Sequence, residues 1–372
     1  MTAAAGAGWD VVGICPETPD QEPLPLDGAR IVRVRGESVA PRLRRMGLGG
    51  IRTRPDPWLG RELRGAFRLL RFARTNVALL RAARAEGAFD TVIANEVETL
   101  PAGRGAARRS HARLVYDAHE IYESVEPGQP RLQRAIFSRI ERALARKADV
   151  VTTVSDPIAD DLRARLRLGT TPVTILNAPA SFEVPMPTPR DGPLRAVYQG
   201  AMGPGRTLDD LLDAAAAADG VQLTIRVANA DLDELRTEAA RRRLDNVSIV
   251  DPVSPTELVE ALAGFDVGVI INRPVSRNDE LVFPNKLFEY MMAGLSVVAP
   301  RLPGLAPLVD GEGIGATFEP ASPASLGAVL SELAADRDRV LAMRRRARQL
   351  AVTRFNAETE AERLVRALSP AA

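Results

Sequence analysis

The chain has 372 residues, enough for two domains of about 150 residues each. Its 49 Lys and Arg stand against 48 Asp and Glu, so the net charge is only +1, which excludes binding of nucleic acid through overall charge. Only Lys147 and Lys286 among these cations are lysines. With Cys15 as the single cysteine and two histidines, the chain lacks the residues for an intrachain disulfide and for a thiolate or histidine-rich metal site. We therefore expect no bound metal and a reducing, cytoplasmic setting.

Short apolar runs alternate with helical patterns along the first part of the chain. The predicted strands are 10–14, 31–34, 91–94, 114–117, 150–154 and 173–176, and helical patterns cover 60–86 and 131–146. This alternation is typical of βαβ units and predicts an α/β fold with a largely parallel sheet.

A proline-rich segment separates this series from a second one. From Ser181 the sequence reads SFEVPMPTPRDGP, which is too stiff and too poor in N–H donors for a strand or helix, and predicts an interdomain hinge. The second series of predicted strands is 195–199, 222–227, 247–250, 266–271 and 296–299. We expect Rossmann-like doubly wound domains over 1–185 and 186–355, facing each other across a ligand cleft, and a C-terminal helix within 356–372 that packs back on the first domain.

The two expected domains differ in charge. Residues 1–185 carry 28 basic and 22 acidic residues, or +6, and the remainder carries 21 and 26, or −5. Residues 30–84 alone hold 15 arginines and 3 acids. Two interpretations stay open: an ordinary solvated arginine face, or contact with an anionic membrane surface or a phosphorylated acceptor.

The sequence DELVFPNKLFEYMMAGLSVVAP, residues 279–300, is the most informative segment. Pro284 suits the first position of a helix and Gly294 suits its end. The free N–H groups of such a helix start, together with the charge of Lys286, form a site for phosphate. The alternative is an ordinary surface ion pair between Lys286 and Glu289, which lie three residues apart.

A glycine-rich loop, GAMGPGRT, follows a predicted strand and precedes a helix. Its glycines, Gly200, Gly203 and Gly205, allow the backbone to approach a ligand closely, and Arg206 extends near the helix start. The loop matches neither a Walker motif nor the dinucleotide fingerprint, so a plain turn remains the alternative. Together with Lys286 it suits a diphosphate bound without a metal.

The sequence RLVYDAHEIYESVE, residues 113–126, carries the candidate acid–base group of the first domain. Its strand should end near Asp117, which leaves His119 and Glu120 at the carboxyl edge of the sheet. His119 is then placed to exchange a proton or to hydrogen-bond a sugar hydroxyl, although a lone histidine is more often structural. His111 reads as a loop residue.

Taken together, these segments resemble glycosyltransferase family 4, retaining enzymes of the GT-B fold that use nucleotide-sugar donors. The resemblance rests on VYDAHE, VTTVSD, ILNAP, YQGAMGPGRTLDDLL and FPNKLFEYMMAGLSVVAP. It implies donor-phosphate contacts at the helix start formed by Phe283, Pro284 and Asn285, and at Arg206. It also implies ribose contact by Glu289, nucleobase contact near Val253 and an active-site role for His119.

The chain departs from the family pattern at three places. The E-x7-E motif would place its first Glu, which contacts the donor sugar, at Leu281, with Glu280 one place earlier. The arginine that often follows the first glycine of the loop is Ala201. At the start, the family's first strand, its glycine loop and most of its first helix are expected to be absent, either because the recorded start is shortened or because the first domain has a different topology.

The resemblance implies a hexosyltransferase that moves a sugar from a nucleoside diphosphate sugar to an acceptor hydroxyl with retained configuration, and needs no cofactor. The acceptor would be a saccharide, a lipid-linked sugar or a small molecule, in polysaccharide, glycolipid or secondary-metabolite glycosylation at the inner face of the cell membrane. The alternatives are a nucleotide-sugar epimerase of the same fold and a non-catalytic nucleotide-sugar-binding partner. A metal-dependent Asp-x-Asp site at 231–233 is less favoured, because those residues read as a helix start.

Overall fold

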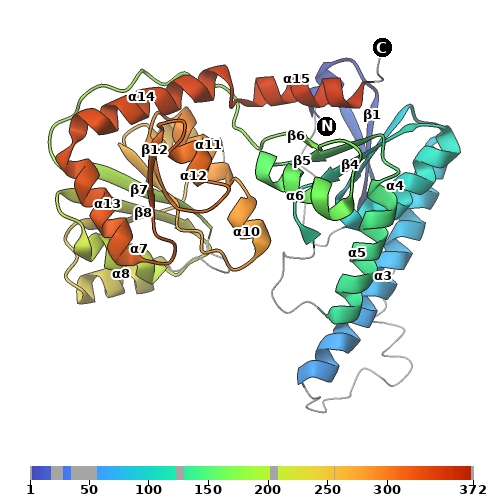
Figure 1. The fold of residues 1–372 in the computed structure, drawn as a ribbon, viewed down its shortest axis with the longest axis horizontal. Coiled ribbons are helices and arrows are strands. Elements are labelled where there is room, and N and C mark those ends of the chain that lie inside the picture. The colour runs from blue at the N-terminus through green and yellow to red at the C-terminus, as the bar shows by residue number, and fades with distance from the viewer. Residues whose placement is uncertain are drawn as a thin grey trace. The chain divides into compact units, whose positions relative to one another are not determined.

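A computed structural model describes residues 2–17, 28–34, 57–122, 130–201, 208–254 and 256–369, apart from the side chains of 57–64. The chain divides into two compact units, shown in Figure 1 with their helices and strands. Unit 1 comprises Met1–Ile175 and Ala361–Ala372, and unit 2 comprises Leu176–Glu360. The division therefore falls at 175/176 rather than at the predicted 185/186.

Unit 1 is built on a parallel sheet. Its strands are β3 (Thr91–Asn95), β4 (Arg113–Ala118), β5 (Val150–Thr153) and β6 (Val173–Thr174), which pair in the order β3-β4-β5-β6. Within the described residues, β1 (Val11–Pro16) and β2 (Ala29–Val34) form a separate parallel pair. The strands predicted for this part are thus confirmed, with bounds that differ by no more than two residues.

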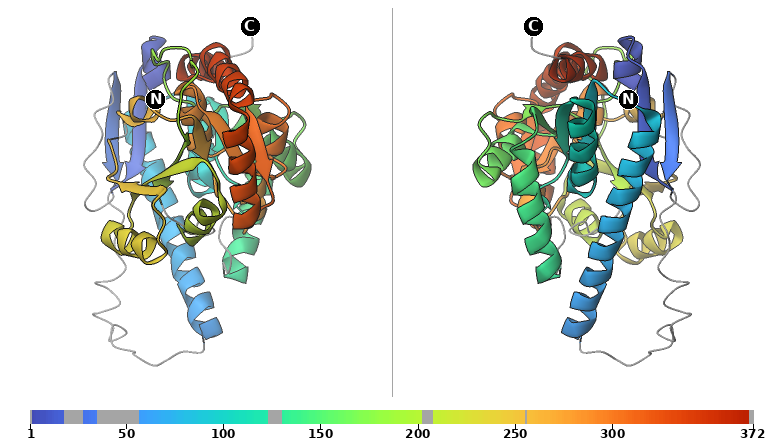
Figure 2. Two further views of the ribbon diagram at one scale, coloured as in Figure 1. Left: turned by 90° about the vertical axis from the view of Figure 1, so that its left-hand side faces the viewer. Right: turned by 90° about the vertical axis from the view of Figure 1, so that its right-hand side faces the viewer.

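Helices pack on these strands and complete unit 1. They are α1 (Thr2–Gly6), α3 (Pro57–Glu86), α4 (Glu96–Ser110), α5 (Arg131–Ala145), α6 (Asp156–Leu166) and the greater part of α15 (Ala357–Leu368). Figure 2 shows the long helix α3 running beside the β1–β2 pair, which it contacts. Near the end of α15, Leu364 and Leu368 pack against Ala4 and Val115, so the C-terminal residues join the core of unit 1.

Unit 2 is built on a parallel sheet in the order β12-β11-β10-β7-β8-β9. Its strands are β7 (Leu194–Ala201), β8 (Val221–Ala228), β9 (Val247–Val250), β10 (Val267–Val269), β11 (Ser296–Pro300) and β12 (Gly315–Phe318). The five predicted strands are confirmed, and β12 was missed because its GATF sequence is short and follows a glycine-rich run. The strand order reverses between β7 and β10, and ligands of doubly wound sheets bind at the carboxyl ends of strands at such a point.

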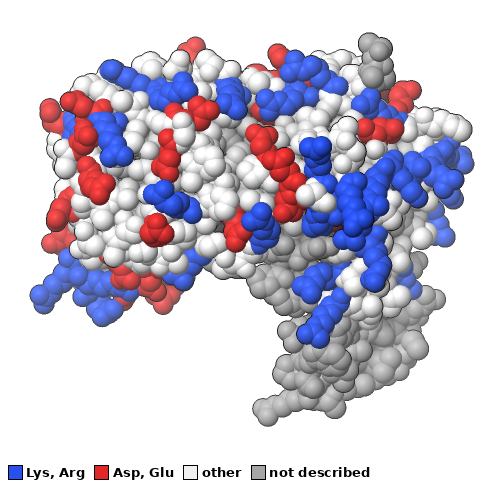
Figure 3. All heavy atoms as spheres, viewed as in Figure 1, with Lys and Arg blue, Asp and Glu red and all other residues white. Residues whose placement is uncertain are grey.

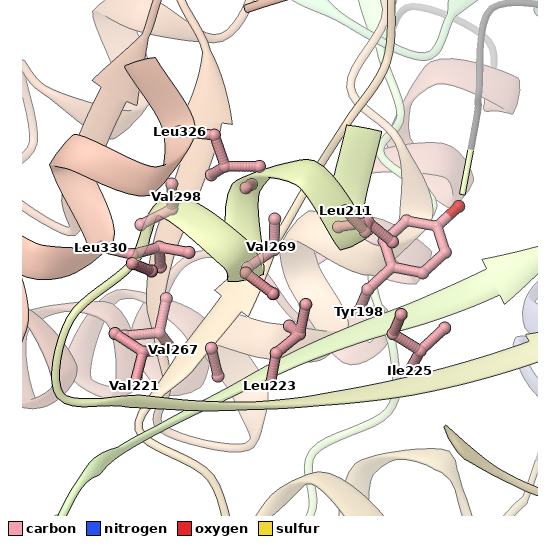
Figure 4. Packing of buried hydrophobic residues seen from close by; sticks show 14 of the residues in the cluster. Tyr198, Leu211, Val221, Leu223, Ile225, Val267, Val269, Val298, Leu326 and Leu330 are labelled. Atoms are coloured by element: carbon pink, nitrogen blue, oxygen red, sulfur yellow. The ribbon is translucent and has the colours of Figure 1, made fainter. Parts of the chain in front are cut away.

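Both faces of the unit 2 sheet are covered by helices. These are α7 (Leu208–Ala217), α8 (Leu232–Arg241), α9 (Leu258–Leu262), α10 (Arg277–Leu281), α11 (Asn285–Met292), α12 (Ala306–Val309), α13 (Pro323–Ala335) and α14 (Arg337–Thr353). Side chains alternate along β7: Tyr198 joins the cluster beneath α7 and α13, where Figure 4 shows it beside Leu211, and Val197 joins the opposite cluster with α11 and α14. The sheet is therefore buried on both faces.

The proline-rich segment predicted as a hinge contains neither helix nor strand, and it belongs to unit 2. Its carbonyl groups accept hydrogen bonds from arginines of α14: Arg348 donates to the Phe182 carbonyl and Arg345 to the Pro187 carbonyl at 3.2 Å. The segment has few N–H donors, so it is held in place through its carbonyl oxygens, which accept hydrogen bonds from these arginines. This is why the division between the units comes before the prolines.

A buried ion cluster closes the amino end of the unit 2 sheet. Asp266, just before β10, is fully buried, and its carboxylate meets Arg344 at 2.9 Å, Arg337 at 3.1 Å and Arg190 at 3.6 Å. Burial lowers the pKa of the Arg344 guanidinium to about 10, and Asp266 opposes that shift. Asp266 therefore joins β10 to α14 and to the proline-rich segment.

Candidate functional site

Lys286 and Gly200 meet at the carboxyl end of β7. Lys286 lies in the first turn of α11, only 7% exposed, and its Nζ stands 4.2 Å from the centre of the Tyr198 ring. A β-carbon built on Gly200 would lie 2.6 Å from the same Nζ. The backbone of Gly200 has a φ of +149°, which residues with a side chain rarely adopt. The glycine therefore makes the space that the lysine fills. A cation held over an aromatic face at this sheet edge is suited to bind an anion.

The start of α11 surrounds this cation with backbone donors. Pro284 is the N-cap residue and Asn285 is the first residue of the helix, one position later than the sequence predicted for the proline. Phe283, just before it, packs edge-on against Phe288 at 6.1 Å between ring centres, which orients the turn into the helix. The free N–H groups of the first turn and the helix dipole add to the charge of Lys286, so this end favours phosphate.

Polar residues of β7 and β8 extend the site beyond the predicted residues. Gln199 is buried, and its side-chain oxygen accepts a hydrogen bond from Arg226 at 3.0 Å. Glu289 of α11 lies close by: burial raises the pKa of its carboxyl, while Lys286 and Gln199 lower it. Arg226 is thus a second cationic side chain at this end of the sheet, held by Gln199, that the sequence did not single out. The signal was the polar alternation of Gln222, Thr224 and Arg226 along β8.

Tyr290 fixes α11 against the sheet. Its hydroxyl accepts a hydrogen bond from the backbone N–H of Gln199 at 3.0 Å and donates one to the Val269 carbonyl at 3.2 Å. Its ring crosses Gly268, where a β-carbon would lie 2.2 Å from the ring. Tyr290 therefore fixes α11 relative to β7 and β10, and this also fixes the position of Lys286.

No hydrogen bond or ion pair joins the remaining predicted donor residues to Lys286 in the part of the chain that the structure describes. Val253 is half-buried in the loop that follows β9. Glu280 lies in α10, where its carboxylate pairs with Arg277 at 2.7 Å on the helix surface, and Leu281 beside it is buried. The predicted loop residues Gly203, Gly205 and Arg206 lie outside the described residues. Asp231, the alternative metal ligand, is the N-cap of α8 and accepts hydrogen bonds from two backbone N–H groups of that helix.

His119 occupies the carboxyl edge of the unit 1 sheet. Its Nε2 lies 2.8 Å from Oδ2 of Asp117, and the other oxygen of Asp117 accepts a hydrogen bond from the Thr152 hydroxyl at 2.6 Å. The hydrogen bond with Asp117 is the main cause of a raised pKa at His119. In turn His119 and Thr152 lower the pKa of Asp117, against the effect of burial, which is the largest single influence. The pair is therefore a charged carboxylate and a ring that tends to keep its proton.

Glu96 adds a second carboxyl group to this edge. It begins α4 directly after β3, and its Oε1 accepts a hydrogen bond from the backbone N–H of His119 at 3.0 Å. Burial, the largest influence, raises the pKa of this carboxyl to about 8, although the charge and the N–H of His119 lower it. The sequence signal was the position of Glu96 at a strand end, one strand away from Asp117.

No group of three or more His, Cys, Asp or Glu able to hold a metal ion occurs in the part of the chain that the structure describes. Among the same residues, no helix combines the length and the apolar character needed to cross a membrane.

Two family models match the chain in succession. The model described as "Glycosyl transferase 4-like domain" matches residues 1–178, and the one described as "Glycosyl transferases group 1" matches residues 194–336. A curated relative is TuaH of Bacillus subtilis (strain 168), named as a candidate teichuronic acid biosynthesis glycosyltransferase, which is 24% identical over 204 residues. That match spans about half of each protein, 51% of this chain and 51% of TuaH.

Solved structures show the same fold. Sucrose-phosphate synthase of Thermosynechococcus elongatus matches with a TM-score of 0.69 at 18% identity, covering 98% of this chain and 90% of that chain. HepE of Anabaena, in complex with UDP, matches with a TM-score of 0.66 at 16% identity, covering 96% of this chain and 99% of that chain.

Proposed function

Because the chain belongs to the family 4 type of glycosyltransferases and has their two-domain α/β fold, we propose that it transfers a sugar from a nucleoside diphosphate sugar to an acceptor hydroxyl with retention of anomeric configuration. The observation that carries this proposal is Lys286, buried beside Gly200 at the start of α11. A buried ammonium group at the strand-order reversal of a parallel sheet is suited to a diphosphate.

The diphosphate leaves as the anomeric bond breaks, and negative charge grows on it. Lys286 and the N–H groups at the start of α11 are arranged for that charge before the reaction begins, which is electrostatic stabilisation of the transition state. Glu289 is proposed to hold the ribose hydroxyls and Val253 to lie near the base. Arg206 is proposed to share the phosphates with Lys286, and no cofactor is required for this step.

His119 is proposed as the group of unit 1 that hydrogen-bonds the reacting sugar. Its ring is held by Asp117 and remains partly exposed, with 45% of the side chain accessible. A histidine so held can donate a hydrogen bond to a hydroxyl or ring oxygen without changing its own position.

Nucleotide binding tests the donor half of the proposal. UDP, the ligand bound in HepE, is the first probe, with GDP and dTDP beside it, in thermal unfolding and calorimetry. We expect UDP to raise the unfolding midpoint of the wild-type chain but not of Lys286→Met. A panel of UDP-sugars with and without saccharide and lipid-linked acceptors, in the presence and absence of EDTA, then tests transfer.

The outcomes separate the proposal from its rivals. A glycosylated product that forms only with an acceptor, and is insensitive to EDTA, supports transfer. An epimerised nucleotide sugar or free sugar in the absence of acceptor indicates the epimerase. Tight nucleotide binding without turnover across the panel indicates a non-catalytic partner.

The helices of unit 1 present a basic surface, which we propose contacts an anionic membrane at the inner face of the cell. It consists of exposed arginines of α3 and α5: Arg68, Arg71, Arg74, Arg81, Arg84, Arg131, Arg134, Arg139 and Arg142. Exposed apolar side chains lie among them, with Phe67 44%, Leu70 55% and Val77 50% accessible. Figure 3 shows Lys and Arg side chains gathered on the side of unit 1 where α5 lies. A basic surface with apolar side chains suits lipid headgroups, at about 1 kcal/mol for each cation.

Vesicle sedimentation tests this surface. The wild-type chain should sediment with phosphatidylglycerol vesicles at low salt, and not with phosphatidylcholine alone. Replacing Arg71, Arg74 and Arg81 by Gln should abolish most of the binding. A matched triple in unit 2, at the exposed Arg236, Arg241 and Arg301, should leave it intact. Equal loss in both variants, or binding to both kinds of vesicle, would contradict the proposal.

A further inference from the structure

Three ionisable side chains of unit 1 meet where two neighbouring parallel strands end. Glu96 directly follows β3, and Asp117 and His119 come from the end of β4. The hydroxyl of Thr152 on β5 supports them from the next strand, through its hydrogen bond to Asp117. The cluster therefore rests on three strands of the sheet and not on a loop alone, so its geometry is rigid.

The backbone at Glu96 is unusual. Its φ is +61°, in the left-handed region that non-glycine residues rarely adopt. Such conformations persist where the surrounding structure requires them, and they concentrate at functional sites. Glycine would adopt this φ without strain, but it would lose the carboxyl oxygen that accepts the His119 N–H at 3.0 Å. The strain and the hydrogen bond together point to a role for the Glu96 side chain.

Asp117 determines which ring nitrogen of His119 is available. Its Oδ2 accepts from Nε2 of His119 at 2.8 Å, and its Oδ1 is occupied by the Thr152 hydroxyl. Within the described residues, Nδ1 of His119 has no hydrogen bond. The ring is thus anchored through Nε2, which leaves Nδ1 as the nitrogen for a ligand.

We propose that Glu96 and Asp117 are positioning residues for His119: Glu96 fixes the main chain at residue 119, Asp117 fixes the ring through Nε2, and Nδ1 is thereby presented to a substrate oxygen. The inference rests on the proposed role of His119 in sugar transfer, but the positioning itself can be measured without any substrate.

Three carboxyl groups face the ring, and they set its charge. Asp117 favours the protonated imidazole most strongly, through its hydrogen bond; Glu120 adds to this effect, and so does Glu96 in its ionised form. A ring that carries a proton on both nitrogens donates from Nδ1, which suits a sugar hydroxyl or ring oxygen as the acceptor of that hydrogen bond. Removing the charge of Asp117 while keeping its shape should therefore change the titration of His119 and not its fold.

The small number of histidines makes a direct experiment practical. The chain has two histidines, so NMR of the histidine-labelled protein gives two sets of ring signals, and His111→Gln identifies the one from His119. In the wild-type chain we expect His119 to titrate above about 6.5, the ordinary value, and its neutral form to carry the proton on Nε2. In Asp117→Asn the pKa should fall toward about 6.5. In Glu120→Gln, the matched control, the pKa should fall less.

Two substitutions of Glu96 separate positioning from simple packing. Glu96→Gln keeps an amide oxygen that can accept the His119 N–H, so the ring shifts and the Nε2 tautomer should resemble those of the wild-type chain. Glu96→Ala removes the acceptor, so the ring signals should move or broaden, and transfer should fall at least tenfold more than in Glu96→Gln. Thermal unfolding of each variant reports whether it is folded.

Either of two results would overturn the inference. One is an unchanged titration and tautomer of His119 in folded Asp117→Asn. The other is equal ring signals and equal transfer in folded Glu96→Gln and Glu96→Ala. If the wild-type chain shows no transfer, the proposed function fails, yet the NMR titrations still decide whether Glu96 and Asp117 position His119.

Discussion

Gly200 and Lys286 are so close that a β-carbon on Gly200 would stand 2.6 Å from Nζ of Lys286, well inside ordinary contact. They are separated by 86 positions in the sequence, and β7 and α11 bring them together at the sheet edge. The glycine is thus part of the cation site although it has no side chain to bind anything.

Replacing Gly200 by Ala should displace Lys286 and strain a backbone with a φ of +149°. We expect affinity for the nucleotide to fall about tenfold, equivalent to about 1.4 kcal/mol, measured by calorimetry with UDP. Gly192→Ala is the matched control, because Gly192 also has a positive φ, of +84°, but nothing lies within 4 Å of its β-carbon position. Equal affinity in Gly200→Ala and Gly192→Ala would show that the close approach to Lys286 does not matter.

Replacing Lys286 by Met keeps the length and packing of the side chain over Tyr198 but removes its charge. Because the proposed leaving group is a diphosphate, kcat should fall about 100- to 1000-fold, the usual effect of removing one group that stabilises transition-state charge. Lys147→Met, at the only other lysine, should leave kcat unchanged, since that residue is exposed just after α5. A Lys286→Met variant with wild-type turnover would refute the proposed role of the lysine.

The raised pKa of Glu96 predicts a pH dependence of stability. The folded chain keeps the Glu96 proton up to about pH 8, whereas the unfolded chain loses it near the ordinary value of 4.5. Since the folded state binds more protons in this window, the free energy of unfolding should fall as the pH rises through it. The raised pKa of His119 acts in the same direction above its ordinary value.

Urea unfolding at about pH 5 and about pH 8 measures this fall, which we expect to be smaller in Glu96→Gln than in the wild-type chain. Asp191→Asn, at an exposed carboxyl group, serves as the control and should follow the wild-type values. The same pH dependence in Glu96→Gln and the wild-type chain would mean that the carboxyl does not keep its proton on folding.

Replacing Asp266 by Asn should destabilise unit 2 by about 3–5 kcal/mol, because it leaves buried guanidinium groups without their carboxylate. Arg344 is the most affected, with only 4% of its surface exposed. Urea unfolding followed by circular dichroism, which reports on the helices of both units, measures the loss, with Asp191→Asn again as the control. A change below about 0.5 kcal/mol, typical of surface substitutions, would show that the cluster contributes nothing to stability.

Local patterns in the sequence were sufficient to predict the strands apart from β12, and the helices α3 and α5. Apolar runs such as 114–117 and 296–299 become buried strands, because such a stretch is stable only where helices cover both faces of its sheet. The exceptions are informative: β12 is short and glycine-bounded, and the proline-rich segment belongs to unit 2 because arginines of α14, far away in sequence, donate to its carbonyl groups.

The sequence by itself also identified Lys286 and His119 as candidate site residues. A lysine after Phe-Pro-Asn at a helix start and a histidine at a strand end can be recognised from the neighbouring residues alone. Only the tertiary structure decided their partners. It set Gly200 beneath Lys286, Arg226 beside Gln199, and Glu96 against the main chain of His119. These pairs join different strands and helices, and their distances follow from strand register and helix packing, which no local pattern encodes.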